Sequence, residues 1–126
     1  MKKIKDILIE ESEKSITQEI CGFVCLGENF YFKEVKNRAS DPNVYFHMST
    51  IDFLSIKNNN KIISIFHNHP ENIENQSSFD KNIADNMCMA SLVYSNMTKK
   101  FSIFIPDSID SDVKDIERLK EEIFND

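Results

Sequence analysis

Two histidines and one aspartate have residue types and spacing that suit a metal ion. His67 and His69 end an apolar, β-branched run, and residues two apart on an extended strand point the same way, about 6.6 Å apart along it. Asp80 follows at the start of a predicted helix. Two imidazole nitrogens and one carboxylate oxygen would give a catalytic zinc ion its three protein ligands and leave the fourth position to water. The sequence therefore predicts a zinc site at these residues.

Each part of this pattern also has a purely structural explanation. A lone H-x-H pair can simply end a strand. Ser77 and Asp80 form the S-x-x-D pattern of a helix start, in which the serine caps the helix and the aspartate faces its positive end. The third histidine, His47, lies in a separate segment and is not assigned to the site. Two histidines and a carboxylate also form the facial triad of non-haem iron oxygenases, so the residue types alone leave the metal open.

The combined spacing is much more specific than its parts. The pattern H-x-H-P-x6-S-x-x-D runs from His67 to Asp80 and resembles the signature of the JAMM metalloproteases, also called JAB or MPN-plus domains. The upstream segment EICGFVCLG, which begins at Glu19, is similar to the E-x-C-G-x-x-x-x-G run of that family. Segments Asn37–Pro42 and Phe101–Pro106 look most like small prokaryotic JAB domains and those of bacteriophage tail-assembly proteins.

The resemblance implies a function and a role for each motif residue. The implied roles are Zn²⁺ binding by His67, His69 and Asp80, general base and then general acid catalysis by Glu19, and oxyanion stabilisation by Ser77. The implied reaction is hydrolysis of a peptide or isopeptide bond after the C-terminal glycines of a ubiquitin-like protein. The partner would be such a protein or a peptide. The alternative is a phage tail-assembly or binding module that keeps the JAB fold and has little catalysis.

Two departures from the family pattern lie near the histidines. Asn68 stands where serine or threonine is more common in the family. Because side chains alternate along a strand, Asn68 should point away from the metal, and little effect on function is expected. The loop Glu71–Gln76 has two acids and no glycine, so substrate preference is expected to differ.

Composition excludes several other classes of function. The chain has 126 residues, with 15 basic and 21 acidic side chains and a net charge of −6, so nucleic acid is not an expected partner. Gly22 and Gly27 are the only glycines, too few for a dinucleotide-binding loop. Charges interrupt the N-terminal apolar residues, so neither a signal peptide, a transmembrane span nor a membrane partner is predicted. Three cysteines without paired spacing fit reduced thiols and a cytoplasmic location.

Apolar periodicity predicts the elements that would position these groups. The expected helices are Lys2–Ser15, Ser49–Lys57, Ser78–Met87 and Val113–Phe124. The expected strands are Ile20–Leu26, Phe30–Val35, Tyr45–Met48, Lys61–His67, Ser91–Ser95 and Phe101–Ile105. This order predicts an α/β fold, a three-layer sandwich with a mixed central sheet flanked by helices. The resemblance implies the cytidine-deaminase-like JAB/MPN form of this sandwich. Residues 1–126 are expected to form one domain.

Overall fold

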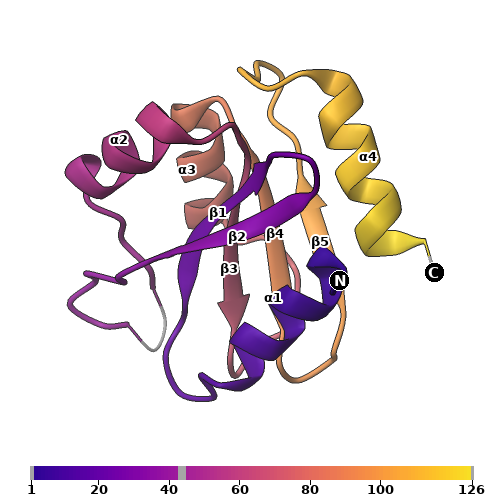
Figure 1. The fold of residues 1–126 in the computed structure, drawn as a ribbon. Coiled ribbons are helices and arrows are strands. Elements are labelled where there is room, and N and C mark those ends of the chain that lie inside the picture. Colours follow the sequence, from indigo (N-terminus) through magenta and orange to yellow (C-terminus); the bar gives the residue numbers. More distant parts are fainter. Residues whose placement is uncertain (1, 43–44, 126) are drawn as a thin grey trace.

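The computed structural model describes residues 2–42 and 45–125, and in these ranges it has four helices and five strands (Figure 1). The helices are α1 (Ile4–Glu13), α2 (Thr50–Asn59), α3 (Ser78–Met87) and α4 (Val113–Phe124). The strands are β1 (Cys21–Leu26), β2 (Phe30–Val35), β3 (Ile62–His69), β4 (Ala90–Ser95) and β5 (Phe101–Phe104). None of these helices is long and apolar enough to cross a membrane.

The strands of the described ranges form one open sheet in the order β2-β1-β3-β4-β5. β3 and β4 run parallel, and the other neighbouring strands run antiparallel. A parallel pair needs a crossover connection, and α3 supplies it between β3 and β4. The predicted α/β class with a mixed sheet is therefore confirmed.

Helices cover both faces of the sheet because its central strands are apolar on both sides. On one face, Leu8 of α1 and Ile116 of α4 belong to the same buried cluster as Phe66 of β3. On the other face, Phe53 of α2 and Ile83 of α3 pack against a second buried cluster. Figure 1 shows the two pairs of helices in separate layers, with the sheet between them. This arrangement is the three-layer sandwich that the order of elements predicts.

A β-bulge in β3 determines which layer its later side chains enter. The β1–β3 ladder shifts register between Val24 and Cys25, which makes Ile63 an extra residue of β3. Ile63 packs on the α1 and α4 side, whereas Ile65, two residues later, packs on the α2 and α3 side. Since strand side chains otherwise alternate with period two, the bulge reverses the phase. His67 follows Ile65 on the α2 and α3 side, where it stacks on Phe46.

β1 and β2 approach each other closely at Gly22. A Cβ atom at this position would lie 2.2 Å from the carbonyl oxygen of Lys33 and 2.9 Å from the Cα of Glu34. Both atoms belong to the backbone of β2, so a rotamer change could not make room. The close pairing at the start of β1 therefore requires a residue without a side chain.

The elements differ from the predicted ones in several places, and three of these differences bear on the site. The strand predicted at Tyr45–Met48 is wrong: this segment has no regular secondary structure, and its backbone instead bonds to the preceding loop, as in the bond from Arg38 N–H to the His47 carbonyl. α1 ends at Glu13, because the chain then turns and the Ser15 carbonyl meets the side chain of Asn68. β3 extends to His69, so both histidines lie within the strand.

Candidate metal centre

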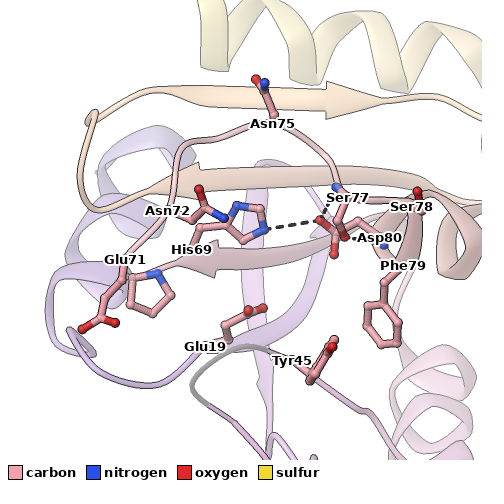
Figure 2. A pocket seen from close by; sticks show the side chains of 11 residues that line it. Glu19, Tyr45, His69, Glu71, Asn72, Asn75, Ser77, Ser78, Phe79 and Asp80 are labelled. Atoms are coloured by element: carbon pink, nitrogen blue, oxygen red, sulfur yellow. Dashed lines mark hydrogen bonds and ion pairs between the residues drawn. The ribbon is translucent and has the colours of Figure 1, made fainter.

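The predicted site residues converge where β3 ends and α3 begins. His67 and His69 lie on β3, Asp80 lies in the first turn of α3, Ser77 is the N-cap of α3, and Glu19 lies just before β1. A pocket of about 460 Å³ is lined by His69, Asp80, Ser77 and Glu19, and the side chains of Glu19, His69 and Asp80 point toward a common space (Figure 2). His67 is fully buried beside this pocket. Residues from three separate segments of the sequence are thus brought together.

The carboxylate of Asp80 faces both imidazoles, one with each oxygen. Its Oδ1 lies 3.1 Å from Nε2 of His67, and its Oδ2 lies 3.3 Å from Nε2 of His69. Ligand atoms about 2.0–2.1 Å from a tetrahedral zinc ion are about 3.3 Å from one another. Each oxygen of Asp80 therefore lies at a ligand-to-ligand distance from one imidazole nitrogen.

The ring nitrogens of His67 are buried polar atoms without hydrogen bonds. His67 is 0 % exposed, and neither Nδ1 nor Nε2 has a hydrogen-bond partner among the residues that the structure describes. The contact from Nε2 to Asp80 lies within ion-pair distance but does not meet hydrogen-bond geometry. Buried polar atoms are nearly always paired, and an ion between Nε2 and the carboxylate would supply the missing partner. The donor set therefore fits a metal ion.

The orientation of His69 also suits a ligand. Its Nδ1 lies 2.7 Å from the carbonyl oxygen of Ile73. A carbonyl oxygen only accepts, so Nδ1 carries a proton and donates it. In the neutral ring this leaves the lone pair on Nε2, on the side of Asp80. Metal-binding histidines commonly have such a partner on the second nitrogen, which fixes the tautomer and the ring.

Ser77 and Asp80 also form a capping box at the start of α3. Ser77 Oγ accepts a hydrogen bond from the Asp80 N–H at 3.1 Å, and the Ser77 N–H donates to Asp80 Oδ2 at 2.9 Å. The structural explanation of the S-x-x-D pattern is therefore confirmed, and it is compatible with metal binding by Asp80. The Ser77 hydroxyl uses its oxygen as the acceptor, so its own proton can still be donated to a group in the pocket.

Glu19 is a buried carboxyl beside the histidine pair. It is 6 % exposed, and one ligand atom from each of Glu19, His67 and His69 lies within 4.8 Å of the others, so these three residues form a candidate metal group. Burial, together with the negative charge of Asp80, raises the pKa of Glu19 to about 8, although the charge of His69 opposes the rise. Asp80 also contacts this group, because its two oxygens lie 3.1 and 3.3 Å from the Nε2 atoms of His67 and His69.

The pKa shifts of His67 and Asp80 favour the states that metal ligands need, whereas the shift of His69 favours the protonated ring, which would have to release a proton on binding. Burial lowers the pKa of His67 despite the nearby Asp80, so the ring is neutral at pH 7. Burial also acts to lower the pKa of His69, but Asp80, the Ile73 carbonyl and Glu19 outweigh it and raise the value. Burial opposes ionisation of Asp80, yet the two imidazoles and the Ser77 N–H hold its pKa well below the usual range. Asp80 is therefore ionised.

An aromatic wall beside the site was not predicted from the sequence. Tyr45 and Phe79 line the pocket, with ring centroids 5.4 Å apart, and Phe46 stacks on His67 at 4.3 Å. Phe79 lies within the S-x-x-D motif, so its sequence position could have identified it as a pocket residue. The position of Tyr45 could not be inferred from the sequence, because its segment reaches the site through irregular backbone. His47 is exposed and is not among the residues lining this pocket.

Comparisons with known proteins show the fold and not the function. No family model and no curated protein matches the chain. The solution structure of protein DSY2949 from Desulfitobacterium hafniense is similar, with a TM-score of 0.62 and 19% sequence identity over 86% of this chain and 85% of that one. An identity this low supports a common fold alone. The structure itself shows an α/β sandwich with a buried Glu-His-His group that is a candidate metal site.

Proposed function

We propose that this protein is a zinc-dependent metallopeptidase of the JAMM type, which hydrolyses a peptide or isopeptide bond. The observation that carries the proposal is the ligand-like spacing of Asp80 from His67 and His69, at 3.1 and 3.3 Å, around ring nitrogens of His67 that have no hydrogen-bond partner among the described residues. The H-x-H-P-x6-S-x-x-D spacing supports the same assignment.

His67, His69 and Asp80 would hold the metal through two nitrogens and one oxygen. A bound zinc ion would lower the pKa of a water molecule and polarise the scissile carbonyl. Zinc fits the donor set because it accepts imidazole and carboxylate ligands in a tetrahedron with one open position. The neutral state of His67 and the ionised state of Asp80 mean that neither ligand must lose a proton before it binds.

Glu19 would move the proton. Its carboxyl accepts a proton from the attacking water and passes it to the departing amine, a role that requires both protonation states near neutral pH. The pKa of about 8 that burial gives Glu19 keeps its protonated form available at that pH. Ser77 would donate its hydroxyl proton to the oxygen on which negative charge develops, while its oxygen keeps the cap of α3.

The pocket supports an extended peptide as the substrate. Tyr45 and Phe79 form one wall, and the loop residues Glu71 and Asn72 lie on the opposite rim (Figure 2). We propose that the acyl part ends in the C-terminal glycines of a ubiquitin-like protein, because residues without side chains can pass close to the main chain and bond to it as an added strand does.

Metal content and turnover of the purified protein test this function. We expect about one zinc ion per chain, lost in His67→Ala and retained in the matched control His47→Ala, because the third histidine lies outside the pocket. The zinc-loaded protein should cleave a fluorescence-quenched isopeptide whose acyl part ends in Gly-Gly and whose amine is a lysine side chain. Glu19→Gln should keep zinc and lose about 10²–10⁴-fold in kcat.

Three results would contradict the proposal. Iron as the natural metal would favour oxygenase chemistry instead. Full zinc occupancy in His67→Ala would place the metal elsewhere. Zinc binding without cleavage of any peptide or isopeptide probe would favour a binding or assembly module that has kept the site.

A further inference from the structure

Asn68 stands between the two histidines and points into the opposite layer. Asn68 is 0 % exposed, and its side chain lies on the α1 side of the sheet, where it contacts the turn after α1. The sequence predicted that a side chain turned away from the metal would have little effect. Its contacts lead to a different conclusion.

The side chain of Asn68 holds the main chain next to Glu19. Its Oδ1 accepts a hydrogen bond from the Ile20 N–H at 2.7 Å, and the backbone N–H of Asn68 donates to the Ile20 carbonyl at 3.4 Å. Its Nδ2 donates to the Ser15 carbonyl at 3.3 Å and to Asn96 Oδ1 at 2.9 Å. These partners settle which end of the amide is the oxygen, since an N–H must meet Oδ1 and a carbonyl must meet Nδ2.

Glu19 and Ile20 precede the regular ladder, and side-chain amides supply part of the hydrogen bonding that holds them. β1 begins at Cys21, where pairing with both neighbouring strands starts. Ahead of that point, Asn37 Nδ2 donates to the Glu19 carbonyl at 2.8 Å, and the Glu19 N–H donates to the Pro42 carbonyl at 2.7 Å. The main chain that carries the Glu19 carboxyl is thus held from one side by Asn68 and from the other by the loop of Asn37.

We propose that Asn68 is a positioning residue that, with Asn37, keeps the Glu19 carboxyl beside the histidine pair. β3 then positions both parts of the site. His67 and His69 supply the ligand nitrogens, and the side-chain amide of Asn68 between them holds the segment of Glu19 to the same strand. The inference rests on the proposed function. A displacement of a catalytic group by about 1 Å can reduce turnover about 10²-fold, so the fixed geometry matters for catalysis.

A purely structural role for Asn68 must be separated from this one. Asn68 also belongs to a buried amide network, in which Asn96 Nδ2 donates to the Ser12 carbonyl at the end of α1 at 2.8 Å. Asn96→Ala is therefore the matched control. It removes the bonds to Asn68 Nδ2 and to Ser12, which stabilise the fold, and leaves the bond from Ile20 to Asn68 Oδ1.

The first measurement is the hydrogen-exchange rate of the Ile20 amide, which NMR detects in protein treated with a chelator. This amide should be protected in the wild type and in Asn96→Ala, and it should exchange at least tenfold faster in Asn68→Ala relative to the amides of β1. In cobalt-loaded protein, paramagnetic broadening of the Glu19 carboxyl carbon reports its distance from the metal. We expect weaker broadening in Asn68→Ala and the wild-type value in Asn96→Ala.

The second measurement is turnover on the Gly-Gly isopeptide probe. Asn68→Ala should lower kcat about 10²-fold, with KM and zinc affinity changed less than about threefold, since the ligands and the pocket walls remain. Asn96→Ala should keep wild-type kcat at a temperature where it is folded. In a Glu19→Gln background, Asn68→Ala should cause no further loss, because a residue that acts through Glu19 has nothing left to position.

The outcomes separate failure of this inference from failure of the proposed function. If neither cobalt nor zinc binds, the proposed function and the positioning role of Asn68 are both wrong. If metal binds but Asn68→Ala keeps the Ile20 protection, the Glu19 broadening or the wild-type kcat, the positioning role alone is overturned. If the probe is not cleaved, the proposed function is wrong, and the broadening of the Glu19 carboxyl carbon in Asn68→Ala decides whether Asn68 positions Glu19. If Asn68→Ala does not fold, Asn37→Ala replaces it, because Asn37 lies in a partly exposed loop, and unchanged Glu19 broadening in that variant overturns the inference.

Discussion

The Asp80 carboxylate takes part in two structures at once. Its Oδ2 accepts the Ser77 N–H in the capping box of α3, while its two oxygens face the imidazoles of His67 and His69. The helix start therefore fixes the carboxylate before any ion arrives, which reduces the ordering that metal binding would require. The same hydrogen bond links the stability of α3 to the geometry of the site.

Ser77→Ala separates the structural and chemical roles of one hydroxyl. The variant should lose about 0.5–2 kcal/mol of stability, because the Asp80 N–H loses its cap, and should keep zinc. Turnover should fall about 10²–10³-fold if the hydroxyl donates to the oxyanion. Urea unfolding, metal analysis and kcat on the isopeptide probe provide the three readouts.

The control for Ser77→Ala is Ser49→Ala. Ser49 caps α2 in the same way, with its Oγ accepting the Asp52 N–H at 3.0 Å, and it is not among the residues lining the candidate site. Both variants should lose similar stability, and only Ser77→Ala should lose turnover. Wild-type kcat in Ser77→Ala would show that Ser77 is a helix cap without a catalytic role.

Burial of Glu19 predicts a pH-dependent stability in chelator-treated protein. Its pKa rises from an ordinary 4.5 to about 8 on folding, so between these two pH values the folded state holds a proton that the unfolded state has released. Stability therefore falls as pH rises through this window and levels off on either side. Urea unfolding at pH 5 and pH 8 should show that Glu19→Gln loses less stability over the window than the wild type. Equal losses in the two proteins would mean that Glu19 is ionised in the folded state.

At the scale of elements, the contact of β1 with β2 depends on Gly22. Gly22→Ala would place a Cβ 2.2 Å from the Lys33 carbonyl oxygen, so the strands must separate, and we expect a loss of about 1–3 kcal/mol or more. Gly27→Ala is the control, because its Cβ would meet Tyr31 at an ordinary 3.7 Å, and it should change stability by less than about 0.5 kcal/mol. Equal melting temperatures for the two variants would show that the strands can adjust.

The sequence was a good guide where local patterns decide the structure. Apolar periodicity predicted α4, and the S-x-x-D patterns predicted the starts of α2 and α3, since a cap depends only on neighbours in the chain. The strand predicted at Tyr45–Met48 failed, because its alternating pattern reflects Phe46 stacking on His67 rather than pairing with another strand. The bulge at Ile63 and the hydrogen bond from Ile20 to Asn68 were beyond prediction, since both depend on residues distant in the sequence.

Residue type and spacing named His67, His69 and Asp80, and the resemblance to the JAMM signature named Glu19 and Ser77. The structure brings all five residues to one place. The motif spacing supplied their identity. Their geometry could not be predicted, because Glu19 reaches the histidines through the β1–β3 ladder and Asp80 through the crossover to α3.

At the scale of the whole molecule, the candidate ligands join β3 to α3 across the layer boundary. A metal ion there would bind only the folded state, so zinc at about one hundred times its Kd should add about 2.7 kcal/mol. For a chain of this size that gain should raise Tm by roughly 10 °C. Thermal unfolding with zinc and with a chelator measures the difference, which His67→Ala should abolish. A wild-type Tm that does not respond to zinc would argue against the site.

The bulge at Ile63 determines which side chains of β3 face the site. Beyond it, odd-numbered residues of β3 enter the layer of α2 and α3, and even-numbered ones enter the layer of α1 and α4. One residue inserted or deleted between Ser64 and His67 would exchange the two sets, sending both imidazoles away from Asp80 and the amide of Asn68 toward it. A change of two residues would preserve the faces but displace the pair by about 6.6 Å along the strand. The loop Glu71–Gln76 lies beyond both imidazoles and is free of this constraint, so changes in its length can remodel the rim of the pocket while the histidines keep their layer.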